Sequence, residues 1–210
     1  MKHIIRNYLL FIIGLFIASF GVALSTKAGL GTSPVASVPY SVSLALPILS
    51  FGGWLNVWSI LQISVQVLLL RRRCKPVEIV IQTVLALTYG YMTDFSCGLL
   101  SGVEMTSYFE QLIFMILSCL VLGFGIWVQF MGGVAMLPGE AMNRAISTVT
   151  GRKYENIKVL FDVIYIVVAV VICLVAIGRL SGVREGSVIA AVAIGNIIKI
   201  YNWIYSKIRK

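Results

Sequence analysis

Four ionisable side chains lie in or beside the long apolar stretches of this chain, where a charge is costly to bury. Asp94 stands near the end of one apolar stretch and Asp162 lies inside another. Glu140 and Arg144 are four residues apart in a less apolar segment, and they share one face if that segment is helical. Charged groups within a membrane usually face the interior of a helix bundle and mark the route of a solute or ion. We therefore expect these four residues to bind or gate a solute.

The nearest cations predict how the two aspartates are held. Lys27 is expected to pair with Asp94, because both belong to the same side of the membrane. Asp162 has two candidate partners: Lys158, one helical turn earlier, and Arg144. A structural alternative stays open, because a Lys158–Asp162 pair near the membrane interface can be a surface ion pair and nothing more.

Two segments rich in glycine and proline interrupt the apolar pattern, one in each half of the chain. They are residues 25–35 (STKAGLGTSPV) and 132–144 (GGVAMLPGEAMNR). Paired breaks of this kind mark the substrate site in many transporters. The two segments add Thr32, Ser33 and Asn143 to the candidate binding or gating residues.

The first break has the sequence of a helix start. Thr32 or Ser33 is a suitable N-cap, and Pro34 a suitable first helical residue. Such an N-terminus offers unpaired N–H groups to an anion. In the second break, Glu140 would repel an anion unless Arg144 offsets its charge.

The composition is that of a membrane protein. Of the 210 residues, 59% are hydrophobic and 12% are charged, about half the charge content of a soluble domain. Crossing a bilayer takes about 20 mostly apolar residues. Six stretches qualify, so we predict an all-α protein with six transmembrane helices at residues 8–24, 54–70, 76–97, 112–131, 157–177 and 186–205.

The positive charges predict the orientation of these spans. All but three of the 17 lysines and arginines fall on one side of a six-span zigzag, the exceptions being Lys27, Arg179 and Arg184. Positive residues gather on the cytoplasmic side, so both termini are expected there. This placement accounts for the net charge of +9 without nucleic acid as a partner.

The chain reads as one membrane domain, residues 1–210, built from two related halves, about 8–98 and 108–206. The tripeptide Gly-Val-Ala precedes the first break at residues 21–23 and recurs at 133–135, early in the second. Three spans per half give the halves opposite orientations, which is an inverted repeat. Each break is expected to form a short half-helix re-entering the membrane, with a helix lying flat at the interface as the alternative.

The sequence contains no motif that indicates enzyme activity or metal binding. No metal-binding or nucleophile motif is present, and the only histidine, His3, is terminal. The four cysteines form no C-x-x-C pair. We expect no enzyme activity, no cofactor and no bound metal.

Three sequence stretches resemble the YczE/YyaS-type family of bacterial integral membrane proteins. They are GVALSTKAGLGTSP at residues 21–34, FGGW at 51–54 and YGYMTD at 89–94. The resemblance implies a bacterial inner-membrane protein and assigns no substrate or functional residue.

These features together predict a secondary transporter for a small polar or anionic solute, which works by alternating access. The alternatives are a substrate-capture or accessory subunit that does not transport, and a lipid-handling protein. The expected partners are the lipid bilayer, the solute and a second copy of the chain or another membrane complex.

Overall fold

The computed structural model describes residues 2–71 and 74–208, and every regular element in these ranges is a helix. The predicted all-helical class is therefore confirmed. In chain order the elements are α1 (Lys2–Ala28), α2 (Pro34–Ala45), α3 (Phe51–Leu70), α4 (Pro76–Leu99), α5 (Tyr108–Gly132), α6 (Pro138–Thr150), α7 (Tyr154–Ile172), the π-helical turn η2 (Cys173–Ile177) and α8 (Glu185–Ile208).

Five helices in the described part of the chain are long and apolar enough to cross a membrane. They are Ile5–Ala28, Phe51–Leu70, Tyr108–Gly132, Tyr154–Ile177 and Glu185–Lys207. The helix at the third predicted span (residues 76–97), α4, is not among them, although its 24 residues extend about 36 Å. It carries Glu78, Gln82 and Asp94, which make it more polar than its neighbours. The arrangement of six spans in two inverted repeats therefore stays a prediction.

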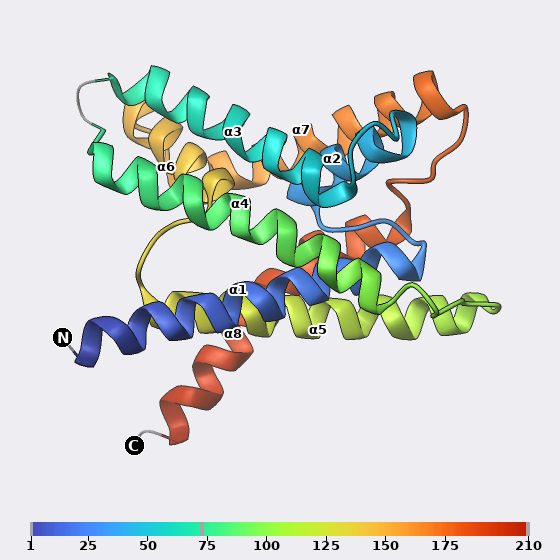
Figure 1. The fold of residues 1–210 in the computed structure, drawn as a ribbon, viewed down its shortest axis with the longest axis horizontal. Helices are drawn as coiled ribbons and strands as arrows, with labels where there is room; N and C mark the ends of the chain where they lie inside the picture. The colour runs from blue at the N-terminus through green and yellow to red at the C-terminus, as the bar shows by residue number, and fades with distance from the viewer. Residues whose placement is uncertain (1, 72–73, 209–210) are drawn as a thin grey trace.

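Residues at the helix ends fix where the longer helices begin and stop. Ser107 and Glu110 form a capping box at the start of α5, which pairs backbone N–H groups that would otherwise lack partners. At the other end of α5, Gly133 adopts a φ of 59°, a left-handed conformation that glycine enters without strain. The chain then turns sharply toward α6 (Figure 1).

The centre of the fold is the crossing of α1 and α5, the most extensive helix contact in the structure. Glycines line both sides of it: Gly14 and Gly21 on α1, and Gly125 and Gly132 on α5. A Cβ atom at Gly21 would lie 2.6 Å from the Leu122 backbone nitrogen. The two backbones thus approach more closely than side chains would allow, as small residues permit in membrane helix pairs.

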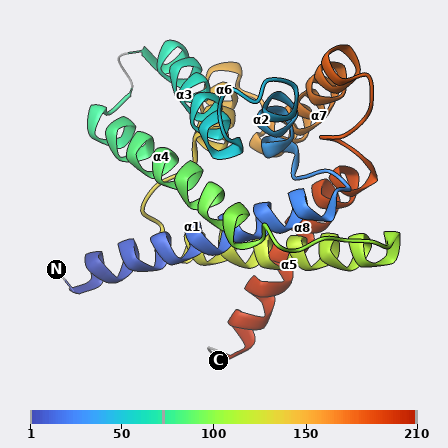
Figure 2. The same ribbon diagram turned by 45° about the vertical axis from the view of Figure 1, so that its right-hand side comes forward.

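Helix contacts in the first half recur in the second. α1 packs on α4 as α5 packs on α8, and α2 packs on α3 much as α6 packs on α7. The short helices are exchanged between halves: α2 lies against α7, and α6 lies equally closely against α3. Figures 1 and 2 show α1 and α5 together on one side of α4, with α2, α3, α6 and α7 grouped on the other.

One helix pair breaks this correspondence. α3 and α4 pack against each other, whereas their counterparts α7 and α8 make almost no contact within the described residues. Figure 1 shows α8 descending away from the other helices toward the C-terminus. The second half is therefore open where the first half is closed.

A methyl group in the α1–α5 crossing tests its importance. We expect Gly21→Ala to lower the free energy of unfolding by about 1–3 kcal/mol, because overpacking forces the two backbones apart. Gly98→Ala in α4 is the control, since nothing lies within 4 Å of its added Cβ atom. Denaturation in detergent micelles measures both, and equal stability of the two variants would contradict the close crossing.

Candidate functional site

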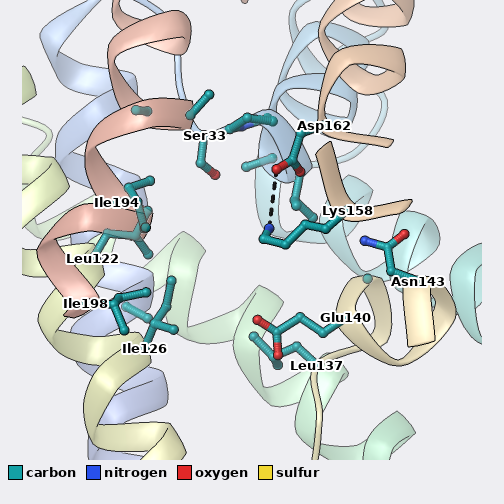
Figure 3. A pocket seen from close by; sticks show the side chains of 18 of the residues that line it. Ser33, Leu122, Ile126, Leu137, Glu140, Asn143, Lys158, Asp162, Ile194 and Ile198 are labelled. Carbon is teal, nitrogen blue, oxygen red and sulfur yellow. Dashed lines mark hydrogen bonds and ion pairs between the residues drawn. The ribbon is translucent and has the colours of Figure 1, made fainter. Parts of the chain in front are cut away.

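A cavity of about 300 Å³ lies between the two halves, where α7 and α8 fail to meet (Figure 3). The starts of α2 and α6 border it, together with side chains from α5, α7 and α8. Its size is at the lower end of the range for ligand pockets, so it suits a small molecule. The residues that line it include Ser33, Leu122, Ile126, Glu140, Asn143, Lys158, Asp162, Ile194 and Ile198.

The first turns of both short helices contribute to this cavity. Ser33 is the N-cap of α2 and Pro34 its first residue, as the sequence predicted, while Pro138 begins α6. The two starts lie close together, because a Cβ atom at Gly139 would be 3.4 Å from Cγ1 of Val35. Both breaks therefore form short helices, and the starts of the two helices lie next to each other.

The first-turn amides of these helices are left without partners. No hydrogen bond is formed by the backbone N–H of Val35, Gly139 or Glu140 among the described residues. The N-cap side chain of Ser33 makes no capping bond either. The cavity wall therefore offers free backbone donors beside its charged side chains.

The charged groups of the cavity come from α6 and α7. Lys158 donates to Asp162 Oδ2 over 3.3 Å, which confirms one of the two partners predicted for this aspartate. The other oxygen, Asp162 Oδ1, is buried and has no hydrogen-bond partner. Glu140 makes no hydrogen bond or ion pair within the described chain, and Figure 3 shows its carboxylate directed into the cavity below Lys158.

Asn143 is the most deeply buried polar side chain of this group. It is 3% exposed, borders the cavity from α6, and its Oδ1 has no partner. A buried amide oxygen without a partner costs about 1–3 kcal/mol, and Figure 3 shows this oxygen turned away from the cavity, with the amide nitrogen on the cavity side.

The opposite wall of the cavity is apolar. Leu122 and Ile126 of α5 and Ile194 and Ile198 of α8 face the charged groups across the space (Figure 3). The cavity thus has one polar side and one aliphatic side, which is the usual composition of a small-molecule site.

Three of the predicted site residues lie outside this cavity. Thr32 is fully buried, and its hydroxyl lies 2.7 Å from that of Ser25. Arg144 faces a different hollow and donates to Met136 Sδ over 3.4 Å, so the pairing of Arg144 with Asp162, offered as the alternative to Lys158, was wrong.

Asp94, the third, fastens α4 to the start of α3. Its carboxylate accepts hydrogen bonds from the Gly52 backbone N–H, over 2.7 Å, and from the Ser50 hydroxyl. Lys27 instead donates to the Ser101 carbonyl over 3.3 Å, so the predicted Lys27–Asp94 pair was also wrong. Asp94 thus closes the α3–α4 pair, and the second half has no comparable contact between α7 and α8 among its described residues.

Lys158 and Tyr154 are cavity residues that the sequence analysis did not propose as a binding group. Together with Asp162 they follow the spacing i, i+4, i+8 along α7. That spacing places all three on one helix face, so the pattern was present in the sequence.

A family model described as "Family of unknown function (DUF6198)" matches residues 5–203. The chain belongs to this family. No curated protein and no solved structure matches it. Membership of DUF6198 assigns no activity, so the site has to be interpreted from its own geometry.

The Asp94 contact predicts a stability loss. We expect Asp94→Asn to lower the free energy of unfolding by about 1.5–3 kcal/mol, the range for a hydrogen bond to a charged group. Chemical denaturation in detergent measures the loss. Glu104→Gln is the matched control, because Glu104 is exposed. A loss of similar size in the control would mean that the Asp94 contact is not what stabilises the α3–α4 pair.

Glu140 lies outside the five candidate spans. Its burial predicts that the stability of the protein depends on pH. Burial raises the pKa of its carboxyl above the ordinary 4.5, Lys158 opposes this rise and Asp162 adds to it. The folded protein therefore holds this proton more tightly than the unfolded chain. Its contribution to stability is fully present below pH 4.5 and is lost as the pH rises through the folded pKa.

We therefore expect Glu140→Gln to melt at a higher temperature than the wild-type protein at neutral pH, with the difference closing toward pH 4.5. Thermal denaturation over this pH range gives the comparison. Glu155→Gln is the control, since it removes the same charge at an exposed position. A difference that stays constant with pH would show that the ionisation of Glu140 is not involved.

Proposed function

We propose that this chain is a secondary transporter for a small polar solute, which works by alternating access between two inverted halves. The observation that carries the proposal is the cavity at the starts of α2 and α6, one short helix from each half. Transporters built from inverted repeats bind their solutes at such broken helices, where the freed backbone groups can contact a ligand.

The correspondence of helix contacts supports a division of the chain into two structurally related halves. Four contacts of the first half have counterparts of similar extent in the second, including the exchanged contacts α2–α7 and α6–α3. The path of the chain agrees with opposite orientations. In Figure 1, α2 and the α7–α8 connection lie to the right, while the end of α3 and the start of α4 lie to the left.

The difference between the α3–α4 and α7–α8 pairs supports alternating access. Phe51 packs against a cluster whose members Ala36 and Leu55 border the cavity. Phe51 also borders a second hollow of about 520 Å³, which contains Lys27. The cluster and the Asp94 contact thus separate the cavity from this hollow. In the proposed cycle, this side opens as α7 closes onto α8.

The charged groups of the cavity have a role in this cycle. Closure of α7 onto α8 would bring Lys158 and Asp162 toward the aliphatic side chains Ile194 and Ile198. Burying charges against an apolar surface is costly unless a solute pairs with them. A bound solute would thus permit the closure that an empty site resists.

The proposed location is the inner membrane of a bacterium, with α4 as the sixth span and both termini in the cytoplasm. The placement of all but three of the 17 lysines and arginines supports this orientation. The resemblance of three motifs to the YczE/YyaS-type family supports the bacterial membrane.

Solute counterflow into liposomes containing the purified chain tests the proposal. Vesicles are loaded with unlabelled amines, amino acids, sugars or organic acids, and the uptake of the labelled compound is followed. We expect exchange of at least one class, reduced about tenfold or more by Glu140→Gln and by Asp162→Asn, because each removes a charged contact.

Glu155→Gln is the matched control and should exchange at the wild-type rate, since this exposed carboxylate lies outside the cavity. Full exchange in both cavity variants would remove these residues from the mechanism. Binding without exchange would indicate a capture subunit, and co-purified lipid in the cavity would indicate lipid handling.

A further inference from the structure

We infer that the cavity binds its solute through a protonated amine attached to a short aliphatic group. This inference deepens the proposed function and rests on it for the passage of the solute across the membrane. Binding itself can be tested without transport.

The unpaired groups in the cavity call for a donor. The Glu140 carboxylate is directed into the cavity and forms no ion pair among the described residues, and Asp162, which borders the same space, has one carboxylate oxygen, Oδ1, without a hydrogen-bond partner. An ammonium group has three N–H donors and no acceptor, so it suits a site with two carboxylates.

The charges of the side chains favour a cation over an anion. Two carboxylates, on Glu140 and Asp162, face one ammonium, on Lys158, which leaves an excess of one negative charge. Arg144, which the sequence placed beside Glu140, lies at a different hollow. A positive charge within reach of both carboxylates would be stabilised in this partly dehydrated space.

The free amides at the helix starts do not reverse this preference. Glu140 is the third residue of α6 and stands in its first turn, where a carboxylate offsets the positive end of the helix dipole. The backbone N–H groups of Val35 and Gly139 remain, and they can donate hydrogen bonds to a carbonyl or carboxylate oxygen of the solute. An amine is therefore the essential group, and a carboxylate beside it is accommodated.

The apolar wall determines the chemistry of the part of the solute that lies away from the amine. Leu122, Ile126, Ile194 and Ile198 offer branched aliphatic surfaces opposite the carboxylates. A space of about 300 Å³ leaves room for a compact chain of a few carbon atoms beside the ammonium group.

Three probes that carry the same isoamyl group test the inference: isoamylamine, isoamyl alcohol and 4-methylpentanoate, in which this group bears an ammonium, a hydroxyl and a carboxylate. Each is added at millimolar concentration to the purified full chain in lipid nanodiscs, and the melting temperature is measured. A ligand that binds the folded state raises it. We expect a rise with isoamylamine that is larger than with the alcohol, and none with the carboxylate.

A fourth probe, leucine, distinguishes amino acids from simple amines as the class of solute. It carries the same kind of group beside a carboxylate. A rise with leucine equal to or above that with isoamylamine points to amino acids, and a smaller rise points to simple amines. Both results agree with the ammonium contact.

Cavity variants connect the effect to the site. Glu140→Gln and Asp162→Asn should each weaken the binding of isoamylamine about tenfold or more, whereas Glu155→Gln should leave it unchanged. Equal stabilisation by 4-methylpentanoate, no rise with the amine, or a rise that survives in both cavity variants would overturn the inference.

The two proposals can fail separately. Binding of the amine without counterflow would leave the site assignment intact and remove the transporter. Counterflow of organic acids or sugars without binding of the amine would do the opposite.

Discussion

The close approach of the α1 and α5 backbones is the constraint on which the rest of this fold depends. Gly14 and Gly21 face α5 without side chains, and Gln129 of α5 donates to the Gly14 carbonyl over 3.2 Å. Lipid surrounds apolar side chains as well as protein does, so tight packing and interhelical hydrogen bonds have to hold such helices together. α4 packs on α1 and α8 on α5, and the cavity lies over this crossing. A wider crossing would separate both halves and with them the two walls of the site.

The exchange of the short helices creates the site. α2 and α6 have 12 and 13 residues, too few to span a bilayer, and each is covered by a long helix of the other half. Unpaired backbone N–H groups at a helix start are satisfied by side chains, by water or by a ligand. The starts of these helices therefore require either water or a solute, and the charged face of α7 lies beside them. The exchange of the short helices thus accounts for the packing, for the unpaired backbone groups and for the position of the proposed ligand site.

Features set by neighbouring residues were predictable from the sequence. The helix starts at Pro34 and Pro138 follow from proline chemistry, and the Lys158–Asp162 pair follows from its spacing on one helix. Features that depend on how one helix is rotated relative to its neighbours were not predictable from the sequence. Arg144 and Glu140 lie on one short helix, yet their side chains reach different hollows. The partners of Asp94 are a backbone N–H and a serine on α3, groups that occur too widely for any spacing to single them out. The gap between α7 and α8 has no signature in composition, because both helices are apolar enough to pair.

The exchange of short helices also has a consequence for synthesis of the chain. A nascent membrane protein emerges from its N-terminus, so α6 leaves the ribosome after its partner α3 and can pack at once. α2 is in the reverse position, because its partner α7 is made only after α3, α4, α5 and α6. Until then its buried serines, Ser37 and Ser41, lack the helix that covers them. The packing of the first half is therefore incomplete until α7 has been synthesised.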